Sequence, residues 1–193
     1  MIGGENVCMH DWPTNTPKVP SPMLVAAWLV LDTLPIERVP IWAAHWIADG
    51  RDGESLRRLA GLSSNDSREV RDLLDAALRE CGVDDRDISP EVSTKKAAAM
   101  EAFTAVAQLQ ASGRASERWV VSKVYEIVEP DFDPELVGLP LGRLFDLDDE
   151  WSAGRGRPDD ELRSEVRGAC RDQLTRCLRN VGPGSRPPLT LST

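Results

Sequence analysis

The sequence predicts an all-α fold, a compact bundle of about six or seven helices with an acidic loop segment and flexible termini. Three observations lead to this prediction. The chain of 193 residues is 41% hydrophobic, which is enough to fill the core of one domain without covalent cross-links. Apolar residues recur at steps of three and four in several segments. Glycine, proline and capping residues stand at the ends of these segments, as they do at the ends of helices.

The chain begins with a stretch that has no helical pattern. Residues 1–21 contain several prolines, two adjacent glycines and no apolar period, which predicts an extended or disordered arm. Ser21 followed by Pro22 is typical of a helix start, because serine caps the first turn and proline fits within it. The helix predicted over 22–33 is apolar on every side, so we expect it in the middle of the core.

Three further helices are predicted before residue 82. A proline and two tryptophans one turn apart indicate a helix over 40–50. Asp52 is placed to cap a short helix over 52–60. The most regular apolar seam of the chain predicts a helix over 66–81, and Gly82 follows it as a stop signal.

The C-terminal half contributes helices over 89–112 and 159–179, each with an apolar stripe. The stretch 117–129 is open to two interpretations, since its β-branched residues suit a strand as well as a helix. We favour the helix, because no second strand offers this stretch a partner. The predicted organisation is an N-terminal arm (1–21), a single helical domain (22–181) and a flexible C-terminal tail (182–193).

The acidic charge is concentrated in one place. The whole chain carries a formal charge of −9, and the segment from Glu129 to Glu150 has eight acidic residues and one arginine, so it accounts for −7 of that total. We expect this segment to be a loop that repels the phosphates of nucleic acids and attracts a basic protein surface.

Membrane and metal-binding functions find no support in the sequence. The longest apolar run, Met23 to Leu31, has nine residues, whereas a spanning helix needs about 20. The four cysteines form no C-x-x-C pair, which is typical of reduced cysteines in a cytoplasmic protein. Two aspartate-rich stretches resemble the start of a calcium loop, but Leu136 and Trp151 stand where that loop requires glycine. We therefore expect a cytoplasmic protein without a metal or a cofactor.

Catalytic side chains are scarce. The chain has only two histidines, and His10 lies in the predicted arm. His45 is the weak candidate for a catalytic base, with Asp49 one turn further along the predicted helix to orient its imidazole. An enzyme or small-ligand-binding protein centred on His45 and Asp49 is thus an alternative function. The other interpretation is a half-buried histidine that stacks among the neighbouring tryptophans and pairs with a nearby carboxylate to stabilise its helix.

A second alternative is a transcription regulator with a helix-turn-helix at 54–81. Two short helices separated by a break at 61–65 have roughly the required shape. The second helix would read the DNA, but acidic residues outnumber arginines on its exposed positions. Such a helix loses most of its attraction to the phosphate backbone, so nucleic-acid binding is not expected.

The leading hypothesis is a non-catalytic helical interaction protein, that is, an adaptor, an accessory subunit or an immunity-type inhibitor. Phe145 precedes and Trp151 follows an acidic run at the end of the acidic segment, and apolar groups framed by acids are typical of docking surfaces for basic protein partners. The same pattern is compatible with a loop that folds back onto its own core. The predicted partner-binding residues are Phe145, Asp146, Asp148, Asp149, Glu150 and Trp151.

Overall fold

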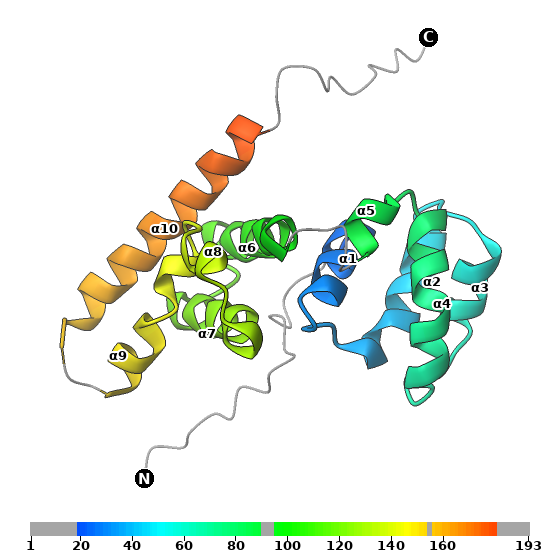
Figure 1. The fold of residues 1–193 in the computed structure, drawn as a ribbon, viewed down its shortest axis with the longest axis horizontal. Helices are drawn as coiled ribbons and strands as arrows, with labels where there is room; N and C mark the ends of the chain where they lie inside the picture. Colours follow the sequence, from blue (N-terminus) through cyan, green and yellow to red (C-terminus); the bar gives the residue numbers. More distant parts are fainter. Residues whose placement is uncertain (1–18, 90–94, 154–155, 181–193) are drawn as a thin grey trace.

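The structure is a computed structural model, and it describes residues 19–89, 95–153 and 156–180. These residues form helices and contain no strand, which confirms the all-α prediction (Figure 1). The predicted arm at 1–21, except for its last three residues, and the predicted tail at 182–193 lie outside the described residues. The α-helices are α1 (Pro22–Val30), α2 (Val39–Ala48), α3 (Glu54–Ala60), α4 (Ser67–Glu80), α5 (Asp85–Ile88), α6 (Lys95–Ala111), α7 (Glu117–Val128), α8 (Pro134–Val137), α9 (Leu147–Ala153) and α10 (Asp159–Asn180), and the 3-10 helices are η1 (Ile36–Arg38), η2 (Glu129–Asp131) and η3 (Gly142–Leu144).

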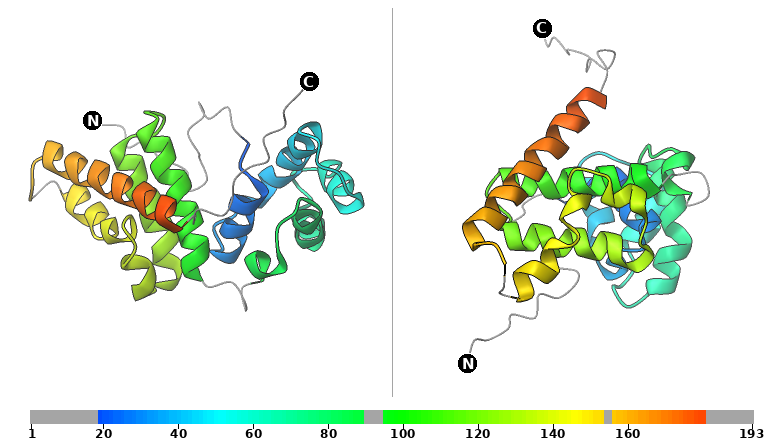
Figure 2. Two further views of the ribbon diagram at one scale, coloured as in Figure 1. Left: turned by 90° about the horizontal axis from the view of Figure 1, so that it is seen from above. Right: turned by 60° about the vertical axis from the view of Figure 1, so that its left-hand side comes forward.

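Helix α1 joins two groups of helices. Helices α1 to α5 form one group and α6 to α10 the other, and α1 packs against α6 between them (Figures 1 and 2). The hydroxyl of Ser21 accepts a hydrogen bond of 3.1 Å from the backbone N–H of Leu24, as the capping pattern predicted. Because neighbours surround it, α1 buries apolar side chains on every face. Its expected place in the core is confirmed.

Helices α3 and α4 form a pair that is closed by a cap from a distant residue. The carboxylate of Glu80, at the end of α4, accepts hydrogen bonds of 3.1 and 2.8 Å from the backbone N–H groups of Ser55 and Leu56. The expected cap by Asp52 is wrong, because this carboxylate binds Arg57 and the N–H of Gly53. A cap contributed across 24 residues leaves no local signal in the sequence.

The segment 117–129 is a helix, α7, and its β-branched residues face the core. Helix α10 packs across α6 and α7 through a stripe that includes Leu162 and Val166. Leu178, near the C-terminal end of α10, is 75% exposed. The reason is that the last turn of α10 extends beyond the other helices (Figures 1 and 2).

The acidic segment is not the loop that we expected. It folds into η2, α8, η3 and α9, and its leucines are buried between α6, α7 and α10. Close backbone packing requires a glycine at Gly142, where a Cβ atom would lie 1.8 Å from the carbonyl oxygen of Leu136. The acidic residues therefore stand on a packed part of the domain. Its buried leucines are Leu136, Leu139, Leu141, Leu144 and Leu147.

Candidate functional site

Three aromatic rings meet at the surface of the acidic segment. The rings of Tyr125 and Phe145 are stacked, with centroids 5.3 Å apart and planes 4° from parallel. The ring of Phe132 lies 5.7 Å from that of Phe145 at an angle of 56°. Tyr125 is 36% exposed and Phe132 60% exposed, while Phe145 is half-buried between them. We call these three side chains the aromatic cluster.

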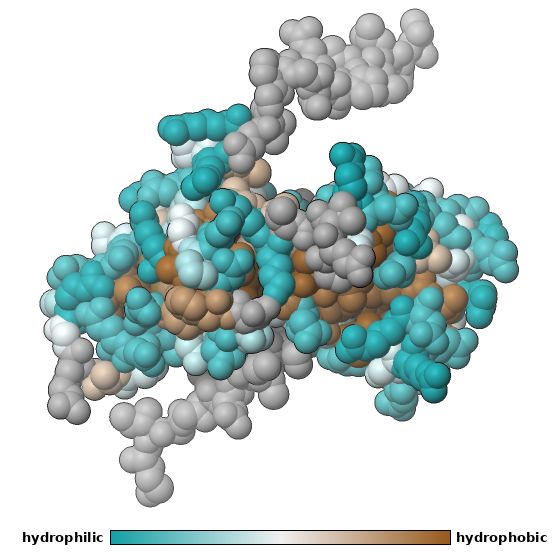
Figure 3. Space-filling view, in the orientation of Figure 1, coloured by the Kyte–Doolittle hydropathy of each residue, from teal (hydrophilic) through white to brown (hydrophobic). Residues whose placement is uncertain are grey.

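Helix ends bring the three rings together. Tyr125 lies in the last turn of α7, and Phe132 follows as the first residue after the short helix η2. Phe145 ends η3, which is held by the close contact at Gly142. Figure 3 shows an apolar patch over α7 with hydrophilic surface around it. Large exposed apolar side chains that touch one another are uncommon on a monomer surface and mark sites of interaction.

Three exposed carboxylates follow rings of the aromatic cluster closely along the chain. Asp146 follows Phe145 directly, and Asp149 lies four residues after Phe145 in the first turn of α9. Glu129 lies one turn after Tyr125, and its N–H donates to the carbonyl of Tyr125. All three acidic side chains are exposed, and none has an ion-pair or hydrogen-bond partner within residues 19–89, 95–153 and 156–180. We call Glu129, Asp146 and Asp149 the acidic rim.

Two of the predicted partner-binding residues are structural. Trp151 is only 7% exposed and belongs to the core, with the Arg163 guanidinium 5.9 Å from its ring centre. Glu150 forms an ion pair of 2.7 Å with Arg157, which also binds Glu165 of α10 at 2.5 Å. The hydrogen bonds from Arg157 lower the pKa of Glu150 to about 2. These contacts fix α9 to α10, so we correct the prediction that Glu150 and Trp151 face a partner.

Of the remaining predicted residues, Phe145, Asp146 and Asp149 reach the surface, and Asp148 is half-buried. Tyr125 and Phe132 were not predicted from the sequence. Their spacing from Phe145 shows no period, so only the packing of η2 and η3 brings them together.

His45 and Asp49 form no side-chain pair among the described residues. His45 is exposed on α2, and Asp49 contacts it through the backbone, by a hydrogen bond of 2.9 Å from its N–H to the His45 carbonyl. Asp49 is the C-cap residue of α2. Among the described residues the imidazole has no carboxylate partner.

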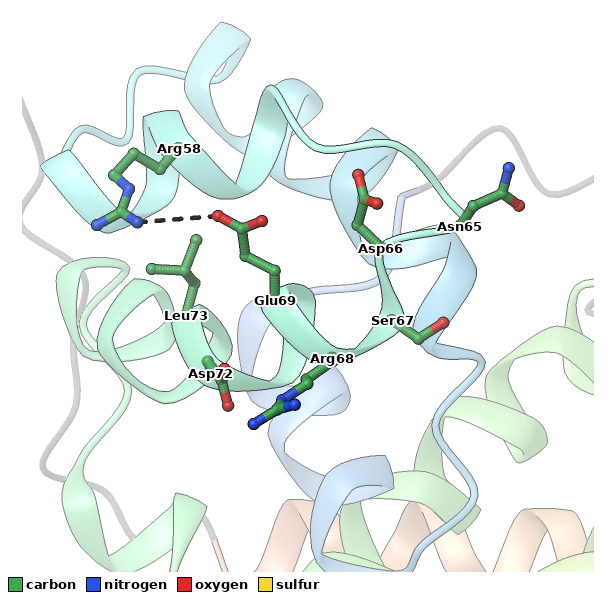
Figure 4. Close-up of a pocket in the computed structure, with 8 residues that line it drawn as sticks. All are labelled: Arg58, Asn65, Asp66, Ser67, Arg68, Glu69, Asp72 and Leu73. Atoms are coloured by element: carbon green, nitrogen blue, oxygen red, sulfur yellow. Dashed lines mark ion pairs between the residues drawn. The ribbon is translucent and has the colours of Figure 1, made fainter.

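A groove of about 710 Å³ lies at the junction of α3 and α4 (Figure 4). This junction falls within the segment 54–81, for which a helix-turn-helix is the second alternative. Its charged lining is mixed, and Arg58 faces Glu69 at 3.9 Å. Acidic side chains outnumber the two arginines along it, so the groove offers no surface that attracts phosphate. Its lining residues are Arg58, Asn65, Asp66, Ser67, Arg68, Glu69, Asp72 and Leu73.

Within the described ranges, no three His, Cys, Asp or Glu side chains come together as ligands for a metal ion. In the same ranges, every helix is too short or too polar to cross a bilayer. Comparison of the chain with models of protein families, with curated protein sequences and with solved structures finds no match.

Proposed function

We propose that this protein is a non-catalytic interaction protein, of the adaptor, accessory-subunit or immunity-inhibitor type, that binds a basic protein partner. The binding surface consists of the aromatic cluster and the acidic rim, which together we call the docking surface. One observation carries the proposal. Three aromatic rings meet, two of them exposed, and the nearest carboxylates along the chain have no partner in its described part.

Physical chemistry favours this pairing of rings and carboxylates. Phenyl and phenol rings bury a large area and have few rotatable bonds, so they supply much of the energy at protein interfaces. The carboxylates supply the long-range attraction that accelerates encounter with a basic surface. They repel nucleic acids, which makes a protein the expected partner.

The test compares two variants that lose equal charge and one apolar side chain of equal fractional exposure. The docking variant carries Phe132→Ala, Asp146→Asn and Asp149→Asn. The control variant carries Ile41→Ala, Asp72→Asn and Asp75→Asn, because Ile41 is as exposed as Phe132, at 60%, and both control aspartates are exposed on α4. Each protein is used to capture partners from an extract of the source cells, and the captured proteins are quantified by mass spectrometry.

We expect the wild type and the control variant to capture the same basic protein. The docking variant should capture less of it, by a factor of about ten or more. The captured protein is then purified, and its dissociation constant for all three proteins is measured. Equal affinity for the docking variant and the wild type would refute the proposed function. Circular dichroism of both variants verifies that they are folded.

A further inference from the structure

We propose that the docking surface recognises an arginine side chain of its partner, whose guanidinium stacks on the aromatic cluster while its edge binds the acidic rim. This inference rests on the proposed function and names the chemical group that the surface selects.

Two other aromatic rings of the chain have a cation over them, and the rings of the aromatic cluster do not, as far as the described ranges extend. The ring of Trp119 has the Lys123 ammonium 5.7 Å from its centre, and the ring of Trp151 has Arg163 at 5.9 Å. In the described ranges, no lysine or arginine lies over Tyr125, Phe132 or Phe145. The negative π-faces of these rings attract cations, and here a partner is the source of one.

The basic side chains close to the cluster in the sequence form ion pairs with other residues. Lys123, on α7, is buried and binds Glu126 at 2.6 Å. Arg143, two residues before Phe145, binds Asp172 of α10 at 3.0 Å. Both bases are therefore held away from the cluster by ion pairs of their own.

Arginine and lysine differ in the shape and the hydration of their charged groups. A planar guanidinium stacks flat on an aromatic ring and still directs N–H groups outward in its own plane, toward carboxylates at the rim. A lysine ammonium is a strongly hydrated point charge and loses more hydration when it contacts a ring. Exposed rings flanked by Glu129 and Asp146 therefore favour arginine.

The test uses the single tyrosine of the chain as a reporter at this site. The protein is prepared with 3-fluorotyrosine and titrated with two capped peptides, one of alternating arginine and glycine and one of alternating lysine and glycine, of equal length and charge. The ¹⁹F resonance of Tyr125 reports ring contact, and fluorescence anisotropy of labelled peptides gives the dissociation constants. Both titrations are made on the wild type, on Phe132→Ala and on the double variant Asp146→Asn, Asp149→Asn.

We expect the arginine peptide to bind the wild type about fivefold more tightly than the lysine peptide and to shift the ¹⁹F resonance further. Phe132→Ala brings the ratio of the two constants close to one, whereas the double variant weakens both peptides by similar factors. Equal binding of the peptides to the wild type overturns the arginine inference, and so does a ratio unchanged by Phe132→Ala. If the double variant still weakens both, charge-based docking stands. If neither peptide binds at about 0.15 M salt, the inference also fails, and the capture experiment alone decides the proposed function.

Discussion

Two groups of carboxylates in this chain have different tasks. Burial by itself would raise the pKa of Glu80 and of Glu117, but hydrogen bonds from backbone amides, and for Glu117 also from Arg167, keep both pKa values below the usual range. These carboxylates hold helices together. Asp146 and Asp149 have no such partners among the described residues. The charge of a segment is therefore a poor guide to its function until its internal partners are known.

The contrast is sharpest within α9 and the turn before it. Asp149 faces solvent, and the next residue, Glu150, is tied to Arg157. The rings differ in the same way, because Trp151 is buried and Phe132 is 60% exposed. This alternation gives the segment a structural side, toward α10, and a free side, which carries the docking surface. Substitutions on the structural side should therefore lower the free energy of unfolding more than substitutions on the free side.

The ring of Trp151 belongs to the structural side, so its removal leaves a cavity. We expect Trp151→Ala to lower the free energy of unfolding by about 4 kcal/mol. Phe132→Ala removes a mostly exposed ring, and we expect a loss below about 1 kcal/mol. Urea denaturation of both variants measures the difference. Similar losses would show that the two rings do not differ in role.

The packing of the acidic segment depends on Gly142. We expect Gly142→Ala to cost about 3 kcal/mol, because the added methyl group would overlap the Leu136 carbonyl and the backbone must move. Gly138→Ala is the matched control in the same segment, since its methyl group would meet only ordinary contacts at 3.5 Å. Denaturation curves of the two variants measure the difference in the free energy of unfolding. If Gly142→Ala is as stable as Gly138→Ala, the close packing of the acidic segment at Gly142 is contradicted.

The ion pairs of Glu117 join α7 to α10. Its side chain is 14% exposed, and it binds Arg167 at 2.9 Å and Arg163 at 3.7 Å. We expect Glu117→Gln to lower the free energy of unfolding by about 1.5 kcal/mol, since both arginines keep access to water. Asp149→Asn should change it by less than about 0.5 kcal/mol. The comparison fails if the two substitutions have the same effect on the denaturation midpoint.

The smallest effect concerns pH. Because the pKa of Glu150 falls from 4.5 to about 2 on folding, its ion pair contributes stability above pH 4.5, and that contribution is lost as the pH falls toward about 2. We expect Glu150→Gln to be less stable than the wild type at pH 7, and we expect the difference to shrink as the pH falls from 4.5 and to vanish below about pH 2. Thermal denaturation at several pH values measures this, and a difference that does not depend on pH would contradict it.

Much of the fold was predictable because its signals are local. Helices α1, α4 and α10 have caps or regular apolar stripes, and α7 follows from the lack of a strand partner. Helix α9 was missed, because seven residues with three consecutive acids resemble a polar loop. The candidate site was predicted in part. Phe145, Asp146 and Asp149 were found from composition, whereas the exposure of Tyr125 and Phe132 and the pairing of Glu150 depend on contacts between distant segments.

Carboxyl footprinting tests the contrast between bound and free carboxylates without a known partner. The folded protein is treated with a carbodiimide and glycine ethyl ester, and mass spectrometry gives the labelling rate at each acidic residue. We predict that Asp146 and Asp149 react as fast as the exposed Asp75 of α4, and that Glu117 and Glu150 react several times more slowly. Slow labelling of Asp146 and Asp149, at the rate of Glu117, would show that they are engaged internally and would remove the basis of the docking surface.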